Sequence, residues 1–405
     1  MEKNILSIKT AETYFQKREL ITIIFLILFF IINPSSSSFA QHSFPNPNSA
    51  ALKTLSLNTS QNEKEIRSQK SEVNLNSDLR PQTTYFGSGL SGLRNNLKDS
   101  LNEYIPLNQF TYAGEERYTL DGSLPRAITK IKPANLAILG GVYAGAFVFL
   151  DIYQRHAWWS DQRGGFHFEE DWVSALQSDK AGHAFGGYIA SYLMSEGLMS
   201  SGFSWDAATI WGGIFGCVYQ TYVEVNDGFA REWGFSPSDW YFDAIGPTFF
   251  LAQHYVPALQ NITPKWQYVP TRWLNEPQIV RPSTFIDDYN SSTFWWSVNV
   301  YNILPENLKQ YWLPWLNVAL GYGADAVDAV KDPNQPPDQL SQRRFVIGLD
   351  YNLVRLLPSG GSFWNWLRQG LNFLKFPSPA IEFGPGGTRF SLLYPFRINL
   401  GGMKF

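Results

Sequence analysis

The chain shows two patterns of hydrophobic positions, one in its middle and one in its last third. In the middle, long segments are apolar on every side, as in ANLAILGGVYAGAFVFLDIY from Ala134. Helices without a polar face are typical of buried bundles or of membranes. The pattern predicts four such helices, over residues 134–153, 182–199, 206–225 and 239–256.

Polar residues and glycines indicate how these helices begin and pack. Ser178 or Asp179, Ser204, and Ser236 followed by Pro237 stand where three of the helices are expected to start. Glycines four residues apart share one helix face and allow helix backbones to approach closely, which predicts one tight bundle. These pairs are Gly141/Gly145, Gly182/Gly186 and Gly212/Gly216.

Past Pro264 the period changes from helical to two. In WLNVALGYG, large apolar residues such as Leu320 alternate with small or polar ones such as Gly321. In RFVIGLDYNL, Ile347 alternates with Gly348 in the same way. This alternation predicts half-buried antiparallel strands. Such segments cover residues 294–302, 315–323, 344–353 and 388–400, with 379–383 as a fifth candidate.

One amphipathic helix is expected among these strands, and it completes the predicted fold. The segment GSFWNWLRQGLNFLKF starts at a capping Ser362 and places Phe363, Leu367, Leu371 and Leu374 on one apolar side. The fold class is therefore α+β: a bundle of about four apolar helices followed by a small antiparallel β-rich region with one amphipathic helix. Alternating aromatic strands also suit outer-membrane barrels, but a closed single-chain barrel needs about eight strands. We expect a small sheet that packs on the bundle or lies at a membrane surface.

The N-terminus has the features of an export signal. Lys17 and Arg18 precede an apolar run over residues 20–32, and Ser38 and Ala40 supply the small residues of a cleavage site. The run is shorter than the roughly 20 residues of a spanning helix, which favours a cleaved signal peptide over an uncleaved anchor. Either outcome predicts an exported chain, in the periplasm or at the outer membrane of a Gram-negative-type bacterium.

Composition shifts divide the chain into five predicted regions. Residues 1–40 form the signal peptide, and residues 41–80, rich in Ser, Asn, Gln and charge, form a disordered linker. Residues 81–130 contain irregular or short β segments. Residues 131–262 form the helical bundle, and residues 263–405 form the β-rich C-terminal region.

Charge and aromatic content narrow the expected partners. The formal net charge of −3 gives no electrostatic basis for nucleic-acid binding. Aromatic residues make up 16% of the chain, with 15 Trp, as is typical of interfaces and membrane-boundary belts. Membrane lipid or other envelope proteins are therefore the expected partners. Cys217 is the only cysteine and lies in an apolar segment, where it is expected to be a small hydrophobe.

Ionisable residues gather at the ends of the predicted apolar helices. Asp179, Lys180 and His183 begin the second helix. Helical spacing then places two further pairs of acids on common faces, with a basic residue between them. These are Glu224 with Asp227, Asp239 with Asp243, and Arg231 in the intervening turn.

Two interpretations of these residues remain open. An isolated carboxylate in an apolar bundle loses several kcal/mol of solvation, so the groups could simply pair and pin the helix ends together. Alternatively they form a site. In one form of this site, His183 binds a divalent metal together with carboxylates such as Glu224 and Asp227. In the other, no cofactor is needed and His183, oriented by Asp179, acts as general acid/base. Its substrate would be a phosphate or amphiphile held by Lys180 and Arg231.

The segments DKAGH, EVNDG and GFSPSDWYFDAIG resemble the DKxxH, ExxDG and GxSxxDxxxNxxG pattern of YfiM-like envelope proteins, a domain of unknown function. The order of motifs is also similar to that of the VanZ-like membrane family. The likeness covers roughly residues 134–260. Asp243 stands where the pattern prefers Asn, and no lipid-attachment cysteine follows the signal segment. The resemblance implies an exported, membrane-associated protein, without an established activity.

Three functional hypotheses follow. The first is an exported envelope protein with a structural or accessory role at the membrane. The second is a metal-dependent or His-based hydrolase or transferase acting on a lipid or cell-wall precursor. The third is an integral helical protein, for which the charge-free segment 207–223 is the best candidate span.

Overall fold

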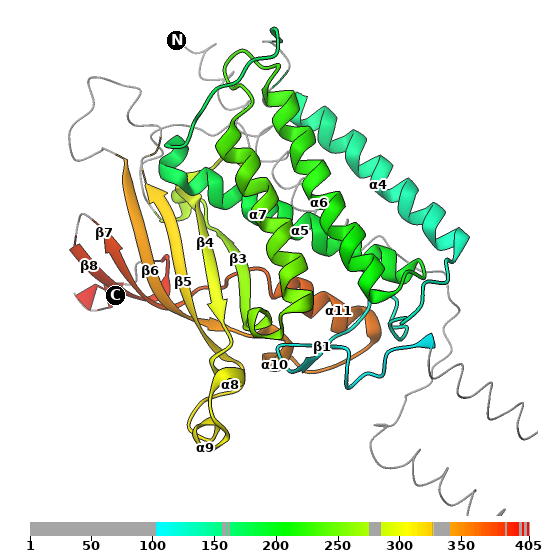
Figure 1. The fold of residues 1–405 in the computed structure, drawn as a ribbon. Helices are drawn as coiled ribbons and strands as arrows, with labels where there is room; N and C mark the ends of the chain where they lie inside the picture. The colour runs from blue at the N-terminus through cyan, green and yellow to red at the C-terminus, as the bar shows by residue number, and fades with distance from the viewer. Residues whose placement is uncertain are drawn as a thin grey trace, which may run out of the picture. The chain divides into compact units, whose positions relative to one another are not determined.

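The computed structural model describes residues 103–155, 159, 163–274, 285–325, 327, 341–384, 387–396, 399–400 and 403–404. The predicted signal peptide and linker, residues 1–80, lie outside the described residues, as does the start of the segment 81–130. In the described part, helices come first and an antiparallel β-rich region follows, which confirms the α+β class (Figure 1).

Four long helices form the bundle: α4 (Pro133–Gln154), α5 (Ser178–Ser200), α6 (Trp205–Asp227) and α7 (Pro237–Tyr255). The Ser204 and Ser236 hydroxyls accept backbone N–H groups at the starts of α6 and α7, so both predicted caps are present. The predicted cap at Ser178 or Asp179 is wrong. Helix α5 already begins at Ser178, after a Gln177 with a left-handed backbone and no capping bond from its side chain.

Glycines bring α5, α6 and α7 together, whereas those of α4 do not contact another helix. A Cβ added at Gly212 would stand 2.6 Å from the Ser191 carbonyl oxygen, and one at Gly246 only 2.0 Å from that of Ala184. Side chains at these positions would therefore push the helices apart. Gly141 and Gly145 of α4 have open space around them. The expectation of one glycine-packed bundle thus holds for three helices and is wrong for α4.

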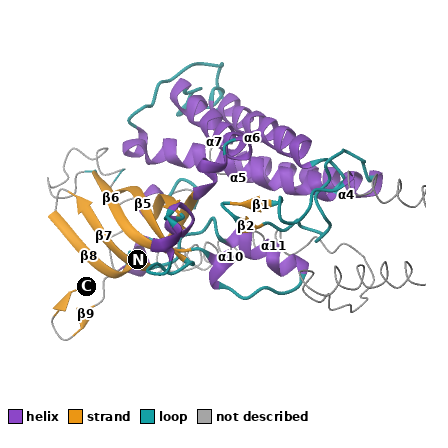
Figure 2. Cartoon of the chain, turned by 60° about the horizontal axis from the view of Figure 1, so that its bottom comes forward, coloured by secondary structure: helices purple, strands orange, loops and turns teal. Residues whose placement is uncertain are grey.

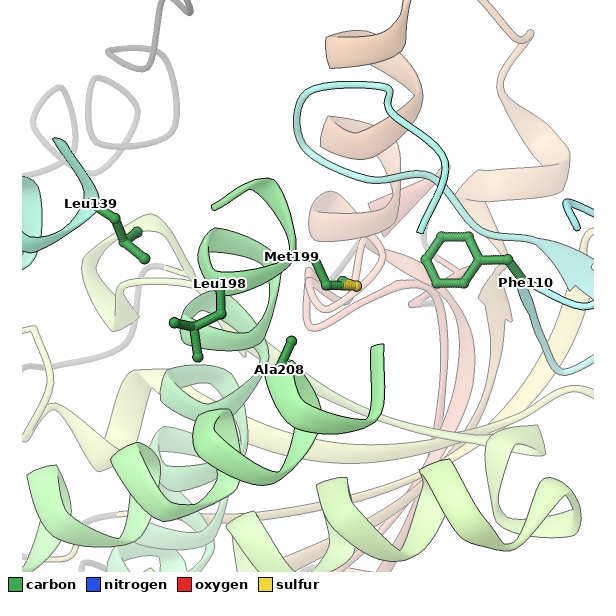
Figure 3. Close-up of a cluster of buried hydrophobic side chains, with 5 residues drawn as sticks. All are labelled: Phe110, Leu139, Leu198, Met199 and Ala208. Carbon is green, nitrogen blue, oxygen red and sulfur yellow. The ribbon is translucent and has the colours of Figure 1, made fainter. Parts of the chain in front are cut away.

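Apolar side chains attach α4 to the end of the bundle where α5 leads into α6. The cluster joins the segment before β1 to α4, α5 and α6 (Figure 3). Its buried members are Phe110, Leu139, Leu198, Met199 and Ala208. Farther along α4, Tyr143 and Phe147 make ring contacts with Phe215 and Tyr222 of α6. Much of the remaining apolar surface of α4 is exposed.

Six strands form one antiparallel sheet in which chain neighbours are also sheet neighbours. They are β3 (Ile262–Tyr268), β4 (Ser292–Val298), β5 (Leu316–Asp325), β6 (Gln342–Tyr351), β7 (Ser378–Gly384) and β8 (Gly387–Tyr394). The described residues thus add β3 to the strands expected from sequence. Two short antiparallel pairs complete the strands of the described part: β1 (Thr111–Tyr112) with β2 (Glu115–Glu116), and β9 (Asn399–Leu400) with β10 (Met403–Lys404).

Short helices connect the strands. Two lie between β4 and β5, α8 (Val300–Ile303) and α9 (Glu306–Lys309), and two lie between β6 and β7, α10 (Leu353–Leu356) and α11 (Ser362–Leu371) (Figure 1). Single 3-10 turns occur at Ser174–Gln177, Pro257–Asn261, Thr271–Leu274 and Tyr289–Ser291. The predicted amphipathic helix is present as α11. Its buried residues are nevertheless Asn365, Trp366 and Arg368, while the predicted apolar residues Phe363 and Leu374 are exposed.

The large apolar side chains of the sheet lie on its exposed face and the charged ones on its buried face, the reverse of a usual half-buried sheet. Along β6 every second residue is buried, and these include Arg344 and Asp350, whereas Phe345 and Ile347 are exposed. The sequence pattern correctly groups the residues by face. The strands are half-buried, as predicted, but the large apolar side chains that such strands normally turn inward lie on the exposed face. The buried face instead holds contacts between side chains of separate strands, such as Lys265 of β3 with Asp350 of β6.

The bundle packs against one end of the apolar face. Phe249 of α7 contacts the Trp296 ring of β4 edge-on, at 5.2 Å between ring centroids, and Phe185 of α5 lies 6.2 Å from Phe294. A cavity of about 300 Å³ remains at this junction, lined by aromatic residues of both elements. Strands β5 to β8 extend beyond the helices (Figure 2).

Among the described residues, α4 is the one helix long and apolar enough to cross a membrane. The segment 207–223 within α6, expected to be the best candidate, does not meet this criterion, since it also contains Thr209, Gln220 and Thr221.

Candidate functional site at the helix junction

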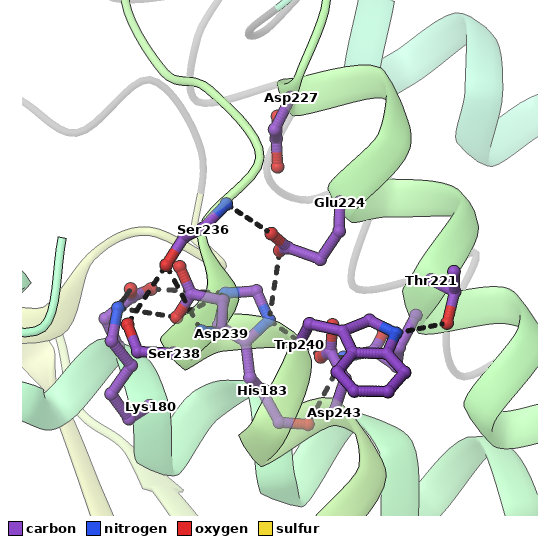
Figure 4. Close-up of polar contacts among 12 residues, drawn as sticks. Lys180, His183, Thr221, Glu224, Asp227, Ser236, Ser238, Asp239, Trp240 and Asp243 are labelled. Atoms are coloured by element: carbon purple, nitrogen blue, oxygen red, sulfur yellow. Dashed lines mark hydrogen bonds and ion pairs between the residues drawn. The ribbon is translucent and has the colours of Figure 1, made fainter. Parts of the chain in front are cut away.

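Charged residues from α5, α6, α7 and the segment before α5 converge on one place (Figure 4). The start of α5 meets the end of α6 and the start of α7, because successive helices of the bundle run in opposite directions. We call the converging residues the junction cluster: Asp171, Asp179, Lys180, His183, Glu224, Asp239 and Asp243. The acids thus outnumber the basic groups in a largely buried setting.

His183 contacts carboxylates through both ring nitrogens. Its Nδ1 lies 2.8 Å from Asp243 Oδ1 and 3.6 Å from Glu224 Oε1. Its Nε2 lies 3.5 Å from Asp179 Oδ1 and 3.6 Å from Asp239 Oδ1. A neutral imidazole has one N–H and can donate to one side only, whereas the imidazolium can donate to both. The arrangement therefore favours the protonated ring.

Lys180 is the second cation of the cluster and is almost fully buried. Its Nζ lies 2.6 Å from Asp171 Oδ1, 2.6 Å from Asp239 Oδ1 and 3.0 Å from Asp179 Oδ2. Three carboxylates around one ammonium offset the cost of its burial. Lys180 thus joins the segment before α5 to the start of α7.

Burial and charge separate the pKa values of these groups. Burial lowers the pKa of His183, but the nearby carboxylates of Asp243 and Asp179 outweigh it and raise that pKa well above the usual value. Burial raises the pKa of Glu224 to about 9 and that of Asp239 to about 8, with neighbouring carboxylates contributing. For Asp179, burial is outweighed by His183 and Lys180, which hold its pKa below the usual value. Glu224 and Asp239 therefore keep their protons to a higher pH than exposed acids do.

Two groups of three residues have the spacing of a cation site. His183 belongs to both, with Asp179 and Asp239 on one side and Glu224 and Asp243 on the other. Within each group one potential ligand atom per residue lies within 4.8 Å of the others. Asp243 is fully buried, and its Oδ2 has no hydrogen-bond partner among the described residues.

Two residues that sequence reasoning placed in the site lie at its edge. Asp227 accepts a hydrogen bond of 2.6 Å from Trp159 Nε1 and belongs to neither group. Burial raises its pKa to about 6. Arg231 is exposed in the turn after α6 and forms no ion pair within the described part of the chain. Asp243 thus stands where the predicted metal set had Asp227.

Other residues of the site were not anticipated. Gln220 donates to Asp243 Oδ1 at 2.8 Å, and its place one helical turn before Glu224 is a signal that sequence could have used. Asp171 lies in the aromatic segment before α5 and accepts from Ser236 Oγ at 2.5 Å. The Tyr289 hydroxyl donates to Asp179 from 110 residues away, and no local pattern points to it.

Residues 165–253 match the model of a family described as a predicted periplasmic lipoprotein (DUF2279). This stretch contains the whole junction cluster. The match fits an exported bacterial envelope protein of unknown function, in agreement with the export signal; the more specific resemblance to YfiM-like and VanZ-like proteins stays a prediction. Cys217, the only cysteine of the sequence, lies inside α6, so lipid attachment is not carried over to this chain. Comparisons with curated proteins and with solved structures find no match.

Proposed function

We propose that this exported protein is membrane-associated, with a structural or accessory role at the outer membrane, and that α4 is its main contact with lipid. The observation that carries the proposal is the exposure of α4. It has no charged residue before Asp151, and side chains such as Ile138, Val148 and Ile152 are at least half exposed. An apolar helix left uncovered in water is costly, since each large side chain contributes about 1.5–3 kcal/mol when buried.

The length of α4 and the exposed apolar side chains of the adjacent helix α6 also support contact with lipid. A helix of 22 residues extends about 33 Å, close to the roughly 30 Å of a bilayer's hydrocarbon core. Helix α6, which packs beside α4, exposes Trp211, Ile214 and Val218. The uncovered apolar surface is therefore shared by two adjacent helices.

Membrane fractionation tests this function. The wild-type full chain is expected in the outer-membrane fraction after a carbonate wash and to need detergent for release. A variant with Ile138→Ser, Val148→Ser and Ile152→Ser is expected to shift to the soluble fraction. Glu306→Ser on the exposed helix α9 is the matched control and should not shift. A wild-type chain that is freely soluble would overturn the proposal.

A second candidate function is a cation-dependent or His-based hydrolase or transferase acting on a lipid or cell-wall precursor. The unpartnered, fully buried Oδ2 of Asp243 favours it, because a buried oxygen normally has a partner. His183, Glu224 and Asp243 would hold a divalent cation, and a histidine with carboxylates suits Zn, Mn or Fe. Such a cation would replace the proton that Glu224 otherwise retains.

Calorimetric titration of the purified protein with Zn²⁺ and Mn²⁺ tests this candidate. Stoichiometric binding that is lost in Asp243→Asn and kept in Asp227→Asn supports it. No binding to the wild type, or equal binding by both variants, contradicts a cation site built on Asp243 and leaves the structural interpretation of the cluster.

A further inference from the structure

We propose that the part of the apolar face of the six-stranded sheet that the helix bundle leaves uncovered contacts the acyl chains of one membrane leaflet. The inference rests on the proposed membrane association, and it assigns a second contact surface that is separate from α4. We call this surface the sheet ladder. Its central row is Trp296, Leu320, Ile347, Ile381 and Phe390, one residue from each of β4 to β8. Trp296 stands at the end of this row and also contacts Phe249 of α7.

The sheet ladder is in register across all five strands. Trp296 pairs with Leu320, Leu320 with Ile347, Ile347 with Ile381, and Ile381 with Phe390. Each side chain is between 39% and 51% exposed, although a cross-strand neighbour stands on either side of the inner ones. A second row, Tyr322, Phe345 and Phe383, follows the same pairing. Phe345 and Phe383 are exposed, whereas the Tyr322 hydroxyl donates to the Leu176 carbonyl next to the bundle. The result is a continuous apolar surface and not a scatter of single exposed residues.

The opposite face of the sheet is buried although it carries charged side chains. Beside a buried cluster of Trp295, Val346 and Tyr394, it holds buried charges. Lys265 Nζ lies 2.7 Å from Asp350 Oδ2, and Lys375 Nζ lies 3.8 Å from Asp350 Oδ1. In water the stable arrangement would bury the large apolar side chains and leave the charges outside. The inverted arrangement is the stable one when hydrocarbon lies on the ladder side.

The residues at the two ends of β6 favour lipid as the environment of the sheet ladder. On the ladder side, Arg343 and Tyr351 bracket Phe345, Ile347 and Leu349. A cation and a tyrosine at the borders of an apolar band are typical of the headgroup level. The apolar run Phe345 to Leu349 rises only about 14 Å, too little to cross the roughly 30 Å hydrocarbon core. The face therefore contacts one leaflet and does not cross the bilayer.

Site-directed spin labelling tests the orientation. In a Cys217→Ser background, single cysteines replace Leu320, Ile347 or Phe390, and the labelled full chain is reconstituted with vesicles of phosphatidylethanolamine and phosphatidylglycerol. Labels on the ladder should collide more with oxygen and less with a water-soluble nickel complex once the vesicles are added. Glu306→Cys on the exposed α9 is the aqueous control and should remain accessible to nickel.

Two labelling results would contradict lipid contact by the sheet ladder. Nickel accessibility on the ladder would overturn the inference, and low collision with both reagents would overturn it in favour of a protein partner or a second copy. A label at Val148 of α4 separates the two proposals. If the Val148 label contacts lipid while the ladder labels are exposed to water, the proposed function is supported and the sheet inference is contradicted. If the labels on α4 and on the ladder are all exposed to water, both proposals are contradicted. Three ladder positions are used so that one poorly folded variant does not decide the result.

Discussion

His183 of α5 and Asp243 of α7 form the shortest contact between the imidazole and the acids of the junction cluster, 2.8 Å from Nδ1 to Oδ1. Their helices approach closely there, because a Cβ on Gly187 would stand 2.9 Å from the Asp243 carbonyl oxygen. The glycine contact and the ion pair thus belong to one packing arrangement.

Removing the imidazole should leave several buried carboxyl groups without their shared cation. His183→Ala is expected to lower the free energy of unfolding by about 3 kcal/mol, as is typical when one partner of a buried ion pair is removed. Urea denaturation followed by circular dichroism measures the loss. His167→Ala, on an exposed segment, should change stability by less than about 0.5 kcal/mol. Equal effects of the two variants would contradict the geometry of the cluster.

Glu224 should make stability depend on pH. Its pKa rises from 4.5 to about 9 on folding, so between these values the folded state binds more protons than the unfolded chain. Stability is therefore highest below about pH 4.5 and decreases as pH rises through 9. Glu224→Gln, which stays uncharged, is expected to be more stable than the wild type at pH 8, with a flatter profile in denaturant titrations across this range.

The exposed Glu306→Gln serves as the control for that measurement and should follow the wild-type profile. A Glu224→Gln profile as steep as that of the wild type would show that another group carries the pH dependence.

Glycines should matter where helices touch and be replaceable where they do not. Gly246→Ala places a methyl group 2.0 Å from the Ala184 carbonyl oxygen, and we expect a loss of about 1–3 kcal/mol from the strain. Gly141→Ala meets open space on α4 and should be neutral or stabilising by up to about 1 kcal/mol, because alanine favours helix. Thermal unfolding of both variants distinguishes these results, and a destabilised Gly141→Ala would place α4 inside a tight contact.

Lys375 should destabilise the sheet while it is charged. Burial lowers its pKa from 10.5 to about 8, so between these values the unfolded chain binds more protons. The contribution of this group to stability therefore rises as pH increases from about 8 to 10.5. Lys375→Met removes the buried charge, and denaturant midpoints should show a higher stability than wild type at pH 7 that shrinks toward pH 10.5. The exposed Lys130→Met is the control, and a constant difference across this range would contradict the prediction.

Much of the local structure could be predicted from sequence. Apolar segments locate α4 to α7 to within a few residues, and the serines before α6 and α7 act as the expected caps. Helical spacing also places His183 one turn after Asp179, and Asp243 one turn after Asp239. These features depend on neighbours in the chain, so a local pattern is enough to find them.

The partners of the junction cluster could not be predicted in the same way. Tyr289 reaches Asp179 from the segment before β4, and Asp171 reaches Lys180 from the segment before α5. Both contacts depend on how separate elements pack. The position of Asp227 in the sequence favours a place in the metal set, but its carboxylate accepts a hydrogen bond from Trp159 instead. This contact depends on the packing of side chains from another segment.

The residues of each strand that share a face can be identified from sequence alone, because side chains alternate strictly along an extended backbone. Only the tertiary structure decided which face is buried. Lys265 and Asp350 are far apart in the chain, and their pairing across the sheet lets the polar side turn inward and leaves Leu320 and Ile347 outside. Periodicity carries no information about what lies against either face, since that depends on the packing of distant segments and on the surrounding solvent.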